Sequence, residues 1–106
     1  MYRYYLSLGL LGPIYKYRSL GCWKDDKDRA IAGEKRKVSS IQECFNIADS
    51  LGNNVFAVES NDECFTASTA KGTYKNHGPC DNCESDGLGG HWCMEVYEIL
   101  GIFLYL

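Results

Sequence analysis

Six cysteines in a chain of 106 residues are the feature that most constrains what this sequence can fold into. The number is even, and reducing compartments of the cell keep their few thiols for catalysis or metal binding. A domain of this length buries a modest core, so each disulfide bond, at about 2–4 kcal/mol, adds a large share of its stability. The cysteines therefore favour a secreted, disulfide-stabilised module over a cytosolic thiol or zinc protein.

Length and charge exclude several other classes of protein. The chain fits one domain, and its net charge of −3 has the wrong sign for a nucleic-acid-binding face. No stretch approaches the roughly 18 apolar residues that a membrane span needs. The apolar content of 45% is ordinary, which argues against disorder. We expect neither a nucleic-acid partner nor a membrane span.

The chain divides into a cysteine-bearing centre, 18–99, and two apolar tails without cysteine. The N-terminal tail, 1–17, is a poor signal peptide because glycines interrupt its short apolar run. Its composition suits two strands, the second over 14–18, joined by a turn at Gly12-Pro13. The C-terminal tail, 100–106, is apolar and reads as a strand that must pair with something. Either the tails pair with each other or they mark a fragment of a longer chain.

The clearest local pattern is one helix over 41–51. Ser40 and Glu43 form a capping box at its start, and Gly52 supplies the left-handed residue that ends it. Apolar residues recur at helical spacing and predict a single buried face, made of Ile41, Cys44, Phe45, Ala48 and Leu51.

Two short strands are expected after this helix. The run VFAV, 55–58, is uninterrupted and apolar, which predicts a strand covered on both faces. Residues 64–65 are expected to form its partner strand. Cys44 on the buried helix face and Cys64 in that strand are then placed to join helix and sheet by a disulfide. Spacing alone does not decide the other pairings.

The segment 66–90 has the composition of a loop, rich in Gly, Asn, Asp, Ser and Thr. A loop of that length in a small domain is expected to be pinned or functional. Cys80 and Cys83 are the residues expected to fix this loop in place through disulfide bonds. The glycines of the run DGLGGHW, 86–92, suit a tight irregular loop and resemble a phosphate-binding loop only superficially, because no Gly-Lys-Ser/Thr follows.

Metal binding is an alternative interpretation of two groups of residues. One is a zinc set with imidazole and thiolate ligands, made of His77, Cys80, Cys83, His91 and Cys93. A structural zinc site usually has a second pair of ligands at regular spacing, which this set lacks. We therefore favour the alternative in which the cysteines form disulfides and the two histidines are exposed to solvent. A redox role for the Cys80–Cys83 spacing is disfavoured because its neighbours indicate a loop rather than a helix start.

The other group lies in GCWKDDKDRAI, 21–31, where calcium would use carboxylates of Asp25, Asp26 and Asp28. The regular calcium-loop spacing is missing. The segment is better explained as a turn in which an aspartate pairs with Arg29 while Trp23 and Ile31 enter the core. We expect no bound metal, no cofactor and no catalytic residues.

Five motifs follow one another along the chain: GCWKDDKDRAI, VFAVES, Cys64, C-x-SDG-x-GG-x-W and EVYEI. In this order they resemble a cysteine-rich extracellular module that is related in pattern to WSC and PAN/apple domains. The resemblance covers 18–99. It implies a small α+β domain in which an antiparallel sheet is crossed by the helix 41–51, with the first and last strands side by side. It also implies the bonds Cys44–Cys64 and Cys22–Cys83. The additional Cys80 and Cys93 suggest a third bond over the glycine-rich loop.

The function implied by the resemblance is non-enzymatic binding of a carbohydrate or a protein partner, as one unit of a larger extracellular protein. Candidate contact residues lie in the pinned loop: Tyr74, Lys75, Asn76, His77, Asp86, His91 and Trp92. Trp92 and Tyr74 would equally suit the core of a small domain. The alternative function is a structural protein that self-associates through its β-rich, tyrosine-containing tails.

Overall fold

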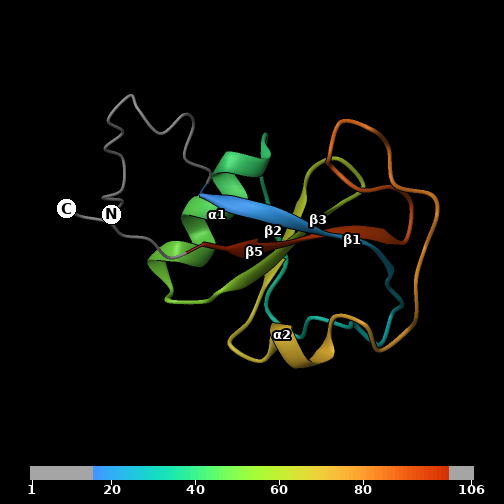
Figure 1. The fold of residues 1–106 in the computed structure, drawn as a ribbon, viewed down its shortest axis with the longest axis horizontal. Coiled ribbons are helices and arrows are strands. Elements are labelled where there is room, and N and C mark those ends of the chain that lie inside the picture. Colours follow the sequence, from blue (N-terminus) through green and yellow to red (C-terminus); the bar gives the residue numbers. More distant parts are fainter. Residues whose placement is uncertain (1–15, 101–106) are drawn as a thin grey trace.

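The computed structural model describes residues 16–100 as one antiparallel sheet with a helix on each face (Figure 1). In chain order the elements are β1 (Tyr17–Lys24), β2 (Arg36–Lys37), α1 (Ile41–Ser50), β3 (Val55–Glu59), β4 (Glu63–Thr66), α2 (Ala70–Thr73) and β5 (Cys93–Ile99). The five strands lie in the order β1-β5-β3-β4-β2. This is a small disulfide-stabilised α+β domain, and the predicted fold class is confirmed.

Helix α1 begins where its capping box predicts. The Ser40 hydroxyl accepts the Glu43 N–H at 3.1 Å, and the Glu43 carboxylate accepts the N–H of Ser39 at 2.6 Å. The helix ends at Ser50, followed by Gly52 at φ 76°. The prediction that Leu51 lies on the buried face is wrong: Leu51 is 54% exposed, because it belongs to the cap rather than to the last helical turn.

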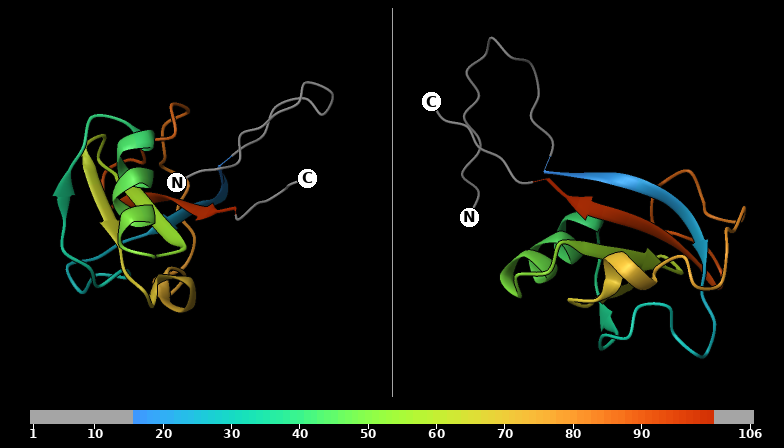
Figure 2. Two further views of the ribbon diagram at one scale, coloured as in Figure 1. Left: turned by 90° about the vertical axis from the view of Figure 1, so that its left-hand side faces the viewer. Right: turned by 60° about the horizontal axis from the view of Figure 1, so that its bottom comes forward.

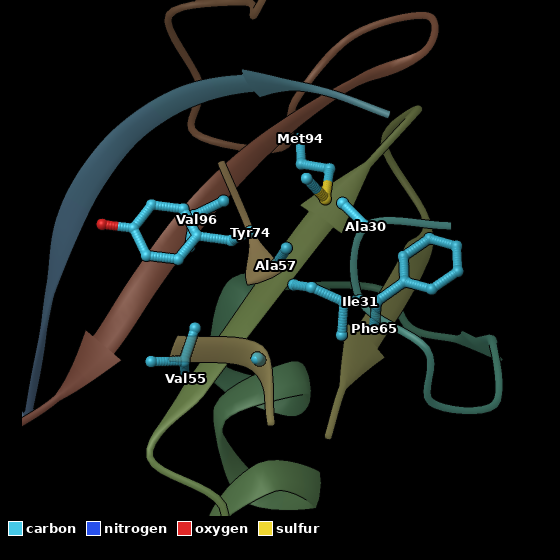
Figure 3. Close-up of a cluster of buried hydrophobic side chains, with 9 residues drawn as sticks. Ala30, Ile31, Val55, Ala57, Phe65, Tyr74, Met94 and Val96 are labelled. Atoms are coloured by element: carbon cyan, nitrogen blue, oxygen red, sulfur yellow. The ribbon is translucent and has the colours of Figure 1, made fainter. Parts of the chain in front are cut away.

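Strand β3 is buried along its whole length, as its uninterrupted apolar run predicts. Phe56 and Val58 pack beneath α1 on one face of the sheet. Val55 and Ala57 point to the other face, where the 25–31 segment and α2 cover them (Figure 3). The alternation puts the last residue of the strand, Glu59, on that second face.

Three disulfides connect the layers, in the pairing that the resemblance implies. Cys44–Cys64 joins α1 to β4 with Cα atoms 5.5 Å apart. Cys22–Cys83 and Cys80–Cys93 attach the long loop before β5 to β1 and β5. Three disulfides are typical of proteins from oxidising compartments.

The segment 66–90 is not wholly irregular, which corrects the prediction of a loop. Its first part contains the single turn α2, whose Ala70 is fully buried against the sheet. Tyr74 caps that turn. Local composition favours a loop, but burial of Ala70 and Tyr74 against β3 and β5 stabilises one helical turn.

The first and last strands lie side by side, as expected. Tyr17 pairs with Ile99, and the Leu100 N–H donates to the carbonyl of Lys16 at 2.8 Å (Figure 2). The turn, strand and pairing predicted for the tails before Lys16 and after Leu100 lie outside the described residues. Among residues 16–100 there is no helix long and apolar enough to cross a membrane.

Removing the helix-to-sheet disulfide should lower stability strongly. The bond closes a loop with a sequence separation of 20, so a Cys44→Ala, Cys64→Ala double variant should lose about 3 kcal/mol of unfolding free energy. Urea unfolding followed by circular dichroism measures the loss. Alkylation with and without reductant is the control, since wild-type cysteines should label only after reduction. An unchanged urea midpoint would contradict the prediction.

Candidate functional site

A cleft of about 300 Å³ opens on the face of the sheet that carries Glu59. Polar and charged side chains surround one indole ring in its lining, which consists of Arg29, Lys35, Glu59, Ser60, Glu63, His91 and Trp92. Trp92 is 39% exposed and, with Leu51, is one of the two large hydrophobic residues exposed in the described part of the chain. A second hollow, lined by Lys24, Pro79, Cys80 and Asp81, has no aromatic ring.

A tight turn holds Trp92 at the rim of this cleft. Reciprocal backbone hydrogen bonds of 2.9 and 3.1 Å between Gly90 and Cys93 place His91 and Trp92 at its two central positions. Trp92 has φ 55°, a left-handed conformation in which such turns favour glycine. Its carbonyl accepts the Asp25 N–H at 2.9 Å. A bulky side chain in a conformation that suits glycine is typical of functional sites.

Arg29 forms the wall beside the indole. Its guanidinium carbon lies 4.9 Å from the centroid of the Phe65 ring and 5.0 Å from that of the Trp92 ring. Both contacts have cation–π geometry. Its Nη1 donates to Asp25 Oδ2 at 2.7 Å and lies 3.7 Å from Glu59 Oε2. One side chain therefore connects the buried acids to the exposed indole.

The two acids beneath Arg29 hold different charges. Burial raises the pKa of Glu59 to about 8, and hydrogen bonding to the Asp25 carboxylate adds to the effect. Burial would also raise the pKa of Asp25, but hydrogen bonds from the Glu59 carboxyl, the Ala30 N–H and Arg29 lower it overall. The buried environment therefore favours the uncharged form of Glu59 and the ionised form of Asp25.

Strand register adds a third carboxyl group. Glu59 in β3 lies directly opposite Glu63 in β4, and like charges at facing positions repel. The Glu63 charge contributes to the raised pKa of Glu59. Glu63 is itself paired with Lys35, whose Nζ lies 3.4 Å from its Oε2. The register thus favours the neutral form of the buried partner.

Of the seven contact residues predicted from the sequence, His91 and Trp92 line the cleft. Tyr74 does not, and the prediction of a contact role for it is corrected. It is buried in the core, where its ring meets that of Trp23 edge-on at 5.5 Å. Lys75 is exposed and places its amine 5.3 Å from the Trp23 ring centroid.

The other three predicted contact residues also lie apart from the cleft lining. Asn76 is exposed next to α2. His77 Nε2 lies 2.7 Å from the carbonyl oxygen of Asp28. Asp86 accepts the N–H of Leu88 at 2.9 Å, so its carboxylate shapes its own loop.

The two groups weighed as metal sites have structural roles here. Asp25 pairs with Arg29 in a turn, and Trp23 and Ile31 pack in the core, as the preferred interpretation of the 21–31 segment predicts. The cysteines of the zinc set are in disulfides. The sulfur atoms of Cys22, Cys80 and Cys93 lie within 4.8 Å of one another, which places these two bonds side by side.

Most of the cleft was not predicted as a site from the sequence. The residues missed are Arg29, Lys35, Glu59, Ser60 and Glu63. One signal was available: the run VFAV continues directly into Glu59, an acid on a strand expected to be covered on both faces. The positions of the other missed residues in the cleft depend on the strand register and on how the 25–31 segment packs against the sheet, which the sequence pattern does not show.

Comparison with known proteins adds no assignment. No protein-family model matches this chain, and no curated protein matches it significantly. The function of the cleft is therefore inferred from its own residues.

Replacing Glu59 by Gln should reduce the loss of stability that the wild-type protein undergoes between about pH 5 and pH 8. The carboxyl releases its proton near 4.5 when unfolded but near 8 when folded. Rising pH across that window therefore favours unfolding by ~1.4 kcal/mol per pH unit. A glutamine amide still donates to Asp25 but does not titrate. Urea unfolding at several pH values measures both curves.

The exposed Glu84 provides the control for this comparison. A Glu84→Gln variant should follow the wild-type pH profile. Parallel profiles for wild type and Glu59→Gln would show that Glu59 is already ionised throughout the window.

Proposed function

We propose that this protein is a secreted, non-enzymatic recognition module that binds carbohydrate in the cleft beside Trp92. The three disulfides support an extracellular setting. The resemblance of 18–99 to WSC and PAN/apple modules supports the same class of function.

The observation that carries the proposal is an exposed indole fixed over a small polar cleft. The C–H face of a sugar ring packs on an aromatic side chain, while its hydroxyls need hydrogen-bond donors and acceptors. Lys35 supplies donors, and Ser60 and Glu63 supply acceptors in the same lining. The volume of about 300 Å³ is at the small end of ligand sites, which suits one sugar ring.

The arrangement of the acids favours binding over glycoside hydrolysis. Hydrolysis uses two carboxyl groups separated by about 5–10 Å, one on each side of the bond that breaks. Here Asp25 and Glu59 are both buried and both lie against the Arg29 guanidinium, at 2.7 and 3.7 Å. They are therefore not placed on the two sides of a substrate.

A protein partner is less well supported by this surface. Protein interfaces have a buried apolar centre that several aromatic or aliphatic side chains build together. Trp92 has polar neighbours in the cleft, and Leu51, the other exposed large hydrophobic of the described residues, does not line it. Self-association through the tails concerns residues outside those described.

Truncating Trp92 should weaken glycan binding strongly and leave the fold intact. We expect Trp92→Ala to weaken binding on a glycan array at least about tenfold. Its melting temperature should fall by no more than about 5 °C, because the contact with Arg29 contributes ~0.5–1 kcal/mol. Leu51→Ala, which removes the other exposed large hydrophobic, is the matched control and should bind normally. Undiminished binding by Trp92→Ala would place the glycan site elsewhere.

A further inference from the structure

We propose that the Trp92 cleft selects uncharged sugar rings over sulfated or carboxylated ones, because both cations in its lining, Arg29 and Lys35, are already paired with carboxylates. This inference rests on the proposed carbohydrate binding and specifies the class of glycan.

Both cations that line the cleft have carboxylate partners. Arg29 is bonded to Asp25 at 2.7 Å, and its guanidinium lies between the rings of Phe65 and Trp92. Lys35 is paired with Glu63 at 3.4 Å. Each cation is therefore matched by one carboxylate, Asp25 for Arg29 and Glu63 for Lys35, so no excess positive charge attracts an anion.

An anionic glycan would have to compete for these cations. A sulfate or carboxylate is bound best by a free guanidinium fork or by an unpaired ammonium. Binding here would break the Arg29–Asp25 or the Lys35–Glu63 pair and leave a carboxylate next to the anion, which is repulsive. A neutral hydroxyl can donate to Glu63 and accept from Lys35 without separating the pair.

The buried position of Glu59 favours its uncharged form. Glu59 is 2% exposed, its Oε2 lies 3.7 Å from Arg29 Nη1, and its Oε1 has no partner among the described residues. A carboxyl group enclosed in this way, with one oxygen unpaired, is less costly to bury when it carries a proton. Burial accordingly raises the pKa of Glu59 to about 8.

Loss of that proton would set two buried carboxylates against one guanidinium. Arg29 would then be drawn toward the acids and away from the Trp92 ring on which it lies. The other charged or titratable side chains at this face are Glu63 from β4, Lys35 from the segment before β2, and His91 from the turn. Sugar binding should therefore weaken above about pH 8.

The selectivity is tested with immobilised neutral oligosaccharides and with sulfated and uronic-acid oligosaccharides, using the full chain. Wild type should bind neutral members through Trp92 and anionic ones at least about tenfold more weakly. The Glu63→Gln substitution removes the carboxylate partner of Lys35 in the cleft. It should increase the affinity for anionic oligosaccharides and so reduce the difference in affinity between the neutral and the anionic class. Asp62→Asn is the matched control: it frees Lys37 from an exposed pair outside the cleft lining and should change neither class.

The role of the proton is tested by measuring neutral-glycan binding from pH 6 to pH 9.5 in wild type and Glu59→Gln. Wild-type binding should fall above about pH 8, and the variant should keep its binding, because its amide mimics the protonated acid. Lys35 and His91 are present in both proteins, so the difference between the curves reports Glu59.

The outcomes separate this inference from the proposed function. Trp92-dependent binding that prefers anionic glycans would overturn the selectivity and leave carbohydrate binding standing. Identical pH curves for wild type and Glu59→Gln would overturn the role of the Glu59 proton. Binding to neither class by a folded, fully oxidised protein would overturn the proposed function itself.

Discussion

The burial of β3 on both faces is the constraint on which the rest of the domain depends. One face is covered by α1, which the Cys44–Cys64 disulfide attaches to the neighbouring strand. The other face is closed by the 25–31 segment and by α2 with its C-cap Tyr74, and Figure 3 shows Ile31 and Tyr74 on the side of the strand that carries Ala57. Because the strand ends in Glu59, this double cover also encloses an acid. The adjacent Arg29, 3.7 Å from the carboxyl, lowers the cost of burying this acid in a way that apolar neighbours could not.

Arg29 connects the buried acids to the rim of the cleft through one side chain. Toward the interior it neutralises Asp25, and toward solvent it lies against the exposed Trp92 ring. The backbone adds a second connection, since the Trp92 carbonyl accepts the Asp25 N–H. The rim of the cleft is therefore joined to the buried acids both through the Arg29 side chain and through the backbone.

Features governed by neighbouring residues were predictable from the sequence, and features governed by register were not. The Ser40 capping box and the apolar spacing predicted α1 to within one residue of its end, and the glycine-rich run pointed to Trp92. The prediction that Leu51 is buried was wrong because helical spacing cannot show where the last turn of a helix ends. For Tyr74, which suited either a contact role or the core, the structure supports the core, because a helical turn that the polar composition does not reveal buries its ring. Glu59 and Glu63 meet only through the pairing of β3 with β4.

The side-by-side arrangement of Lys16 and Leu100 determines how the domain would respond to pulling. Tension applied at these points would peel β1 from β5 one hydrogen-bonded pair at a time, because the strands are antiparallel. Peeling would stop at Cys22 and Cys93, whose disulfides both lead into the short segment 80–83. From there the load would pass through covalent bonds. The lining of the Trp92 cleft would remain outside this path of force, so the cleft could keep its shape while the strand ends are extended.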